Sequence, residues 1–255
     1  MDRISLLLKM LSTVRTWWTY IAHMLGRVKS DRVAYRLRNG MTIILRTHSS
    51  DRNVFNDIWL EHVYAHPEIE WEKCKTIIDI GAHIGLFTCY AAARSPQASM
   101  YAFEPEPSNA DLLEENIRIN GLSGRVRVER KGAAGKDGTL TLNVIPGRGE
   151  ANSAYRQGEN SYGIAVPVIS LEHIFSLGNI GHCNLLKVNC EGEEYDLLYM
   201  LPPHFFQWID AMLINYHLFS PNPEHHPQKL IPFLERQGYT VTKHPHEILF
   251  VRRAS

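Results

Sequence analysis

The sequence lacks features that would assign it to a class at once. Its 27 Lys and Arg residues are balanced by 27 Asp and Glu residues, so neither sign of charge is in excess. Proteins that grip nucleic acid usually carry a basic excess, so we expect no nucleic-acid partner. The chain also has no run of ~18 uninterrupted apolar residues, the length that a membrane-spanning helix needs.

Cysteine is scarce. The chain has four cysteines in 255 residues, with no CxxC pair and no zinc-like spacing. We therefore expect no metal site, and reduced thiols of a cytoplasmic protein. What the sequence does have is an ordinary globular composition, 44% hydrophobic and 21% charged, over a length sufficient for one sizeable core. The cysteines are Cys74, Cys89, Cys183 and Cys190.

The beginning of the chain has helical spacing of apolar residues. We expect residues 1–37 to form an amphipathic helical extension of a domain over residues 38–255. Two interpretations stay open: this helix packs on the domain or against a second subunit of a homo-oligomer, or residues 4–25 make peripheral contact with a membrane surface. Trp17, Trp18 and Tyr20 suit the second. The apolar positions are Ile4, Leu8, Leu11, Val14, Trp18, Ile21 and Leu25.

Strand and helix patterns alternate from about residue 76 onward. Such alternation with short links predicts an α/β protein with a mostly parallel sheet covered on both faces, in a Rossmann-like arrangement that ends in an antiparallel hairpin. The expected strands are 76–80, 99–103, 125–130, 139–144, 165–169, 185–188, 212–215, 239–242 and 248–251. The expected helices are 86–94, 107–120, 193–200 and 228–237.

A glycine turn joins the first of these strands to a helix, and it carries the first sign of chemistry. Gly81 and Gly85 permit tight turning and close approach to a ligand. The helix start is expected to offer unpaired N–H groups to a carboxylate, and Asp79 to accept from an ammonium group. An amino-acid moiety suits this pair of groups, whereas Asp79 would repel a pyrophosphate. Glu104, at the end of the next strand, is placed to accept from both hydroxyls of a ribose. The pattern therefore favours S-adenosyl-L-methionine (SAM) as the ligand over NAD.

The segment around this turn resembles the FkbM family of SAM-dependent methyltransferases. The motifs are DIGAHIG (79–85), AFEPEPSN (102–109), NIRINGL (116–122), LLKVNCEGEEYDLL (185–198) and LINYH (213–217). The resemblance spans about residues 38–251. It implies the class I methyltransferase fold, SAM as cofactor, and O-methylation of a hydroxyl on a sugar or small natural product. The cofactor-binding residues it indicates are Asp79, Gly81, His83, Gly85, Glu104, Asn109 and Ala133, with Ser50, Asp51 and Tyr64 closing over the methionine end.

At two positions the chain departs from the family pattern. Asn189 stands where the family has Asp in Lys-x-Asp-x-Glu-Gly, and Asn215 where it often has Glu before x-His. An amide cannot act as a base and is a poorer ligand for a hard cation. We place Asn189 and Asn215 among substrate or orienting residues.

Three side chains near these amides remain as catalytic candidates. His217 suits proton abstraction, because the ordinary histidine pKa is near 6.5. Glu191 is the alternative base, or else only a helix cap, and Lys187 is an orienting group or a structural ion partner of Glu191. We expect Glu194 to be solvated.

The sequence does not name the methyl acceptor. A hydroxylated small molecule, either a carbohydrate or a secondary metabolite, is the first expectation. Loops at about 40–66, 146–163 and 217–227 are the expected acceptor-binding segments, and His225-His226 lies in a loop that is read as a lid or as plain loop rather than a metal site. Alternatives are an RNA or protein methyltransferase, a non-catalytic SAM-binding protein and, last, an NAD-dependent oxidoreductase.

Overall fold

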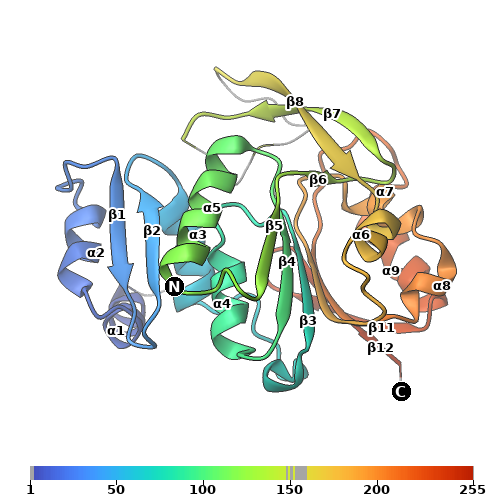
Figure 1. The fold of residues 1–255 in the computed structure, drawn as a ribbon, viewed down its shortest axis with the longest axis horizontal. Coiled ribbons are helices and arrows are strands. Elements are labelled where there is room, and N and C mark those ends of the chain that lie inside the picture. The colour runs from blue at the N-terminus through green and yellow to red at the C-terminus, as the bar shows by residue number, and fades with distance from the viewer. Residues whose placement is uncertain (1–2, 148, 150–151, 153–159, 255) are drawn as a thin grey trace.

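A seven-stranded sheet forms the centre of the protein in a computed structural model, which describes residues 3–147, 149, 152 and 160–254. The strand order is β11-β12-β10-β9-β3-β4-β5. All neighbours run parallel except β12, which pairs antiparallel with both β10 and β11. The predicted α/β fold, with its mostly parallel sheet and antiparallel closing hairpin, is confirmed (Figure 1).

The elements of this sheet follow the sequence patterns closely. Every expected strand and helix from residue 76 onward is present, with ends that differ by a few residues. The strands are β3 (Thr76–Ile80), β4 (Ser99–Phe103), β5 (Val126–Glu129), β9 (Cys183–Val188), β10 (Ile209–Asn215), β11 (Tyr239–His244) and β12 (Ile248–Arg253). The helices are α4 (Leu86–Arg94), α5 (Pro107–Ile119), α6 (Leu171–Leu177), α7 (Glu194–Tyr199), α8 (Pro203–Phe206) and α9 (Pro227–Arg236).

Hydrophobic side chains fill both faces of the sheet. Along β3, Ile77 belongs to one apolar cluster, while Ile78 and Ile80 belong to another. Successive side chains of a strand point to opposite faces, so a strand buried on both sides reads as a continuous apolar run. Leu185 and Leu186 divide between the same two clusters on β9. The first cluster contains α4 and α5, and the second contains α6, α7 and α9.

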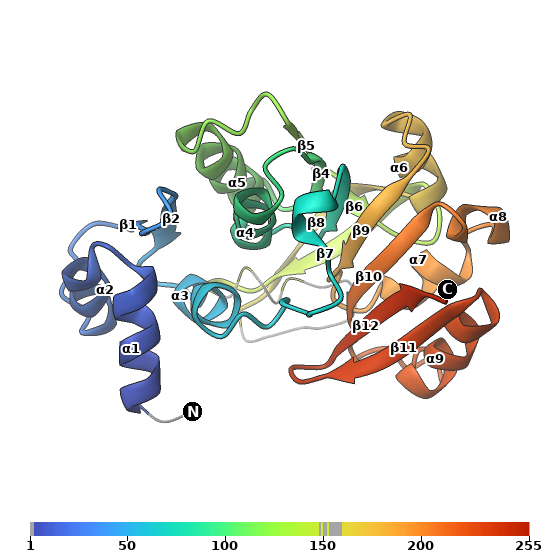
Figure 2. The ribbon, with the colours of Figure 1, turned by 90° about the horizontal axis from the view of Figure 1, so that it is seen from below.

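The N-terminal segment forms a separate lobe at one end of the molecule (Figures 1 and 2). It consists of α1 (Arg3–Thr13), α2 (Trp17–Met24) and the antiparallel pair β1 (Arg32–Arg36) and β2 (Thr42–Arg46). The expected single helix over residues 4–25 is therefore two helices. The break falls at Val14, which is fully buried and forms a β-bridge with Leu37. The division into domains at residue 37 stays a prediction, and β1 and β2 pair across it.

Three further segments complete the fold. After β2 the chain forms α3 (Asp51–Phe55), a π-helical turn (Asn56–Leu60) and a short 3-10 turn (Trp71–Lys73). A second sheet, β6 (Gly132–Ala133), β7 (Gly138–Val144) and β8 (Tyr162–Ile169), has the order β6-β8-β7. The last two are the added strand pair that the sequence predicts. Figure 1 shows this sheet beyond the carboxyl ends of β3 and β4, where ligands bind in such folds.

Candidate functional site

The glycine turn after β3 is held against the end of β9. Gly81 has φ +71°, a backbone conformation that favours glycine. A Cβ at this position would lie 1.7 Å from the backbone oxygen of Asn189. Asn189 in turn donates its backbone N–H to the Ile80 carbonyl over 3.0 Å. Only glycine therefore allows β9 to pass this close to the turn.

Asp79 is bound to Lys187 beneath this turn. The two residues are register partners on β3 and β9, and Lys187 Nζ lies 2.9 Å from Asp79 Oδ1. Thr88 donates to Asp79 Oδ2 over 2.6 Å. The Lys187 ammonium also donates to the carbonyls of Ile80, at 3.2 Å, and Gly81, at 2.8 Å. The alternative in which Lys187 is a structural ion partner of Glu191 is wrong, because Lys187 pairs with Asp79, its neighbour across the sheet.

The backbone N–H groups of the turn are already engaged. Gly81 and Ala82 both donate to the carbonyl of Phe103 over 3.0 Å, and His83 donates to Glu104 Oε2 over 2.8 Å. The end of β4 lies beside the turn and accepts from these three N–H groups, so they are not available to a ligand carboxylate. The expectation of unpaired N–H groups concerns the start of α4 and stays a prediction.

Glu104 is the acidic group expected at the end of β4. It is buried and accepts from the backbone N–H groups of His83 and Glu106 and from Asn109 Nδ2. Burial raises the pKa of Glu104 to about 7, although these hydrogen bonds act in the opposite direction. A carboxylate with several lone-pair sites can still accept from hydroxyl groups.

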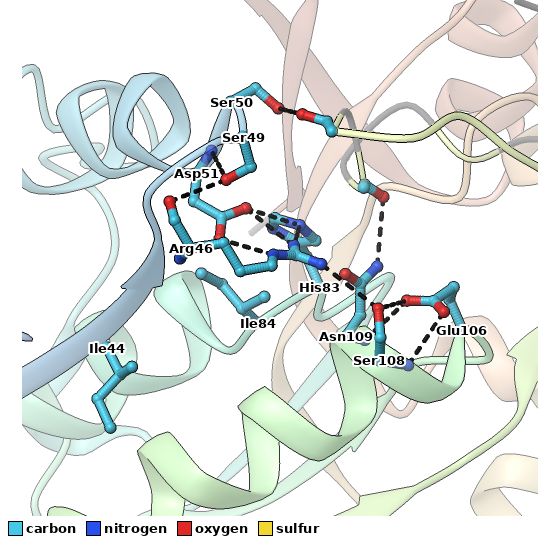
Figure 3. Close-up of polar contacts among 12 residues, drawn as sticks. Ile44, Arg46, Ser49, Ser50, Asp51, His83, Ile84, Glu106, Ser108 and Asn109 are labelled. Atoms are coloured by element: carbon cyan, nitrogen blue, oxygen red, sulfur yellow. Dashed lines mark hydrogen bonds and ion pairs between the residues drawn. The ribbon is translucent and has the colours of Figure 1, made fainter. Parts of the chain in front are cut away.

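A network that begins on β2 reaches the turn from the other side (Figure 3). Arg46 donates from Nε to Asp51 Oδ2 and from Nη2 to Asp51 Oδ1, each over 2.9 Å. Burial alone would raise the pKa of Asp51, but the hydrogen bonds and charge of Arg46 outweigh it and hold this pKa below its usual value. Arg46 Nη2 also lies 2.9 Å from His83 Nε2. Arg46 was not among the residues predicted from the sequence, and no local pattern marks it.

These contacts fix the tautomer of His83. Burial lowers the pKa of His83 to about 4, so the ring is neutral near pH 7. Arg46 is always a donor, so Nε2 accepts and the proton sits on Nδ1. Nδ1 is buried and has no hydrogen-bond partner among the described residues. A buried donor without a partner costs about 1–3 kcal/mol, which a bound acceptor would relieve.

A cavity lies over the turn. It measures about 920 Å³ when the open space at its mouth is included. Among the described residues, the predicted site residues that line it are Tyr64, Gly81, His83, Glu104, Ala133, Lys187, Asn189 and Glu191. Those that lie outside this lining are Ser50, Asp51, Asp79, Gly85, Asn109, Asn215 and His217.

Much of the cavity wall is apolar and was not predicted as part of the site. This part comes from α4 and from the second sheet. Of the expected acceptor loops, 40–66 contributes Val54, Ile58 and Tyr64, and 146–163 contributes Gly149 and Asn152, whereas no described residue of 217–227 lines the cavity. Residues 148, 150–151 and 153–159 lie outside the described residues. The unpredicted apolar lining residues include Phe87, Leu140, Leu142, Val166 and Val168.

His217 lies between two carboxylates. Its Nε2 is 3.2 Å from Glu191 Oε1, and its Nδ1 is 3.1 Å from Glu194 Oε1. Burial alone would lower the pKa of His217, but the hydrogen bonds and charges of these two carboxylates raise it to about 10. The ring is therefore an imidazolium near neutral pH and has no lone pair with which to take a proton. The premise that His217 titrates near 6.5 is wrong.

Glu194 is a buried anchor of this group. It is fully buried and accepts from the backbone N–H groups of Gly192, at 2.8 Å, and His217, at 2.7 Å. The expectation of a solvated Glu194 is wrong, because α7 presents this side chain to the loop after β10. Asn215, before that loop, accepts from the Tyr64 hydroxyl over 2.8 Å.

The His225-His226 segment is an anchored loop. His225 is buried, stacks on Tyr195 and places Nε2 3.0 Å from Asp196 Oδ1. His226 accepts from the backbone N–H of Gln228 at the start of α9. The reading as plain loop describes it better than the reading as a lid. In the described part of the chain no group of three or more His, Cys, Asp or Glu residues is placed to hold a metal ion.

Comparison with known proteins agrees with this geometry. The family model for the methyltransferase FkbM domain matches residues 79–241. Methyltransferase 1 of Beauveria bassiana is 27% identical over 184 residues, which cover 61% of this chain and 74% of that protein. The 31-O-demethyl-FK506 methyltransferase FkbM of Streptomyces tacrolimicus is 29% identical, over 36% of this chain and 35% of its own. The hexuronic acid methyltransferase AglP of Haloferax volcanii is 28% identical, over 51% of each chain. The family match covers more than half of the sequence, from Asp79 through the glycine turn and the Lys187–Glu194 segment to β11, and the chain belongs to the FkbM family of SAM-dependent methyltransferases.

Proposed function

We propose that this enzyme methylates a hydroxyl group of a carbohydrate or a small natural product. The observation that carries the proposal is the cavity over the glycine turn, whose mostly apolar wall includes two buried polar atoms that have no partner among the described residues, His83 Nδ1 and Asn189 Oδ1. The names of two relatives support it: one is a 31-O-demethyl-FK506 methyltransferase and the other a hexuronic acid methyltransferase. Apolar walls with a few fixed polar groups are typical of small-molecule sites.

The unpartnered atoms suit an amino-acid moiety. His83 Nδ1–H is a donor for a carboxylate, and Asn189 Oδ1 is an acceptor for an ammonium group. Glu104 is the acceptor for ribose hydroxyls. Ala133 and the apolar residues of β7 and β8 form a surface for a flat ring. These residues fit SAM, which supplies the methyl group on a positively charged sulfur.

Asp79 takes an indirect part in this arrangement. Its carboxylate is fully buried and bound to Lys187 and Thr88, so it is not available to an ammonium group. We propose that Asp79 orients Lys187, whose ammonium group fixes the carbonyls of Ile80 and Gly81. Lys187 is then a positioning residue of the glycine turn rather than a catalytic one.

Glu191 is our candidate for the group that accepts the hydroxyl proton. It lines the cavity and contacts the His217 imidazolium, which holds the carboxylate in place. A carboxylate is a much weaker base than an alkoxide, so we expect proton transfer late in the methyl transfer rather than before it. His217 then acts by positioning Glu191.

The test is transfer of a labelled methyl group from SAM to a panel of hydroxylated sugars and secondary metabolites. Each acceptor is paired with its analogue already O-methylated at the candidate position. We expect label on an acceptor with the free hydroxyl and none on its blocked partner, and loss of turnover with retained SAM affinity in Glu191→Gln. SAM binding without transfer to any acceptor would identify a non-catalytic SAM-binding protein, and transfer to RNA or protein would identify those acceptor classes instead.

We extend the proposal to the surroundings of the enzyme. We propose that the enzyme forms a homo-oligomer, is cytoplasmic and contacts a membrane peripherally through residues 4–25. In the described residues no helix has the length and apolar character that a bilayer span requires.

A further inference from the structure

Charge is distributed unevenly along this electrically neutral chain. Residues 1–46 hold 9 basic and 2 acidic residues, whereas residues 47–255 hold 18 basic and 25 acidic residues. The first group makes up the N-terminal lobe, which lies at one end of the molecule (Figure 2). The lobe is therefore a basic body attached to an acidic one.

Helix α2 of this lobe turns its apolar face to solvent. Trp17, Trp18 and Met24, with Leu25 at the C-cap, occur at i, i+1, i+7 and i+8, which places them within an arc of about 120°. The exposed fractions are 41% for Trp17, 57% for Trp18, 48% for Met24 and 53% for Leu25. A surface helix normally buries its apolar face, so this stripe is reversed. Such a patch marks an interaction site.

The opposite side of α2 is fixed to the rest of the protein. Tyr20 is buried and donates from its hydroxyl to Asn56 over 3.0 Å. His23 is buried between the Tyr35 hydroxyl, 2.6 Å from Nδ1, and the Thr47 carbonyl, 3.1 Å from Nε2. The apolar stripe is therefore held facing outward.

Basic residues stand at both ends of the stripe. Arg15 precedes α2, and Arg27 and Lys29 follow it, all three exposed. Between residues 3 and 30 the sequence has no acidic residue. In a two-fold dimer through this stripe each patch would meet itself, so these cations would face one another. An anionic bilayer surface instead accepts the aromatic and aliphatic side chains at its interface and attracts the cations.

We propose that α2 docks the protein on an anionic lipid bilayer. Trp17, Trp18 and Leu25 enter the interfacial region, and the three basic residues contact lipid phosphates. This docking rests on the peripheral membrane contact proposed above for residues 4–25, and it assigns that contact to α2 and to anionic lipid. It depends on no residue of the cavity, so its failure would leave the proposed methyl acceptor untouched.

The experiment is co-sedimentation of the full chain with vesicles of phosphatidylcholine, with and without phosphatidylserine. We expect binding only when phosphatidylserine is present, with weakening at high salt. Arg15→Gln/Arg27→Gln/Lys29→Gln should reduce the partition coefficient about a hundredfold, because each basic residue near such a surface contributes about fivefold. The matched control, Arg118→Gln/Lys136→Gln/Lys243→Gln, removes the same charge elsewhere and should bind normally.

The apolar part of the stripe has its own control. Trp17→Ser/Trp18→Ser should lose vesicle binding, whereas Tyr162→Ser, which removes a side chain 55% exposed on β8, should keep it. SAM affinity, measured by calorimetry, should be unchanged in all of these variants. Unchanged affinity would show that the variants fold. Vesicle binding that does not depend on phosphatidylserine, or that persists in both N-terminal variants, would overturn the proposal. Two other results would also overturn it. In the first, the parent does not bind vesicles and these variants change it from a dimer to a monomer. In the second, the variants lose binding to RNA and nothing else.

Discussion

His217 gives the sharpest test of the structure, because its charge state decides what it can do. Its ring lies between Glu191 and Glu194, at 3.2 and 3.1 Å, and its pKa is raised from 6.5 to about 10. A difference of that size corresponds to about 5 kcal/mol of interaction with the protonated ring. A folded-state pKa above the unfolded value stabilises the protein fully below pH 6.5. The contribution then falls as pH rises and is lost above about pH 10.

The measurement is a titration of histidine Cε1 resonances by NMR, with His217→Gln used to assign the signal. We expect a midpoint far above 7 for His217, and a lower midpoint in Glu194→Gln, which removes one of the two negative neighbours. In His217→Gln the free energy of unfolding should lose its decline between about pH 7 and 10, because the titrating group is gone. Methyl transfer in the parent should show no rise that follows histidine ionisation near pH 6.5. A His217 midpoint at or below 6.5, or a rising limb of activity abolished in His217→Gln, would refute the positioning role and restore His217 as the base.

Four other predictions follow from the same geometry. Gly81→Ala should abolish SAM binding and lower the free energy of unfolding by about 3 kcal/mol or more, since its Cβ would lie 1.7 Å from a backbone oxygen; normal calorimetric affinity would contradict this. Lys187→Met should cost about 3–5 kcal/mol by leaving a buried carboxylate unpaired, and Asp79→Leu/Lys187→Met should recover melting temperature but not SAM affinity; recovery of both would remove Lys187 from the site. SAM affinity should rise as pH increases through about 7, because Glu104 ionises there and becomes a full acceptor. In calorimetry Glu104→Gln should bind SAM weakly at every pH. An equal pH dependence in that variant would disprove the assignment. His83→Phe, which removes the Nδ1–H donor, should weaken SAM binding about tenfold or more with little change in melting temperature, and unchanged affinity would leave this donor without a ligand.

The sequence predicted the elements of the fold well, because each depends on local patterns. Thr76–Ile80 reads as a buried strand through its apolar run, and the helix Pro107–Ile119 begins with a proline and is followed by Gly121 at φ +66°. The N-terminal helix was the exception. Its apolar spacing continues through Val14, but pairing of Val14 with Leu37 interrupts the helix, and such a contact leaves no mark in the local pattern.

The site was predicted less completely, because its contacts join distant segments. Lys187 and Asp79 meet only because β9 lies beside β3, a neighbour relation that depends on the strand order of the whole sheet. Arg46 reaches His83 from β2, across 37 residues of sequence. The apolar wall from β7 and β8 also required the path of the second sheet. Motifs identified residues that carry chemistry, but the structure determined which of them are in contact.

The two amides at Asn189 and Asn215 can be understood from the charge of the side chains in and around the cavity. Asp79 and Lys187 neutralise each other, and Glu191 and Glu194 with one His217 imidazolium carry a net charge of about −1. Glu104, with a pKa of about 7, adds part of another negative charge. A carboxylate at 189 would add another negative charge to the partly apolar cavity, and one at 215 would add a further charge beside Tyr64, just outside the lining. Unpaired charge in such surroundings is costly. With amides at 189 and 215, the side chains in and around the cavity keep a small net negative charge. This charge complements SAM, which carries one net positive charge on sulfur. The departures from the family pattern are therefore compatible with SAM binding, and Glu191 is the candidate that remains for accepting the hydroxyl proton.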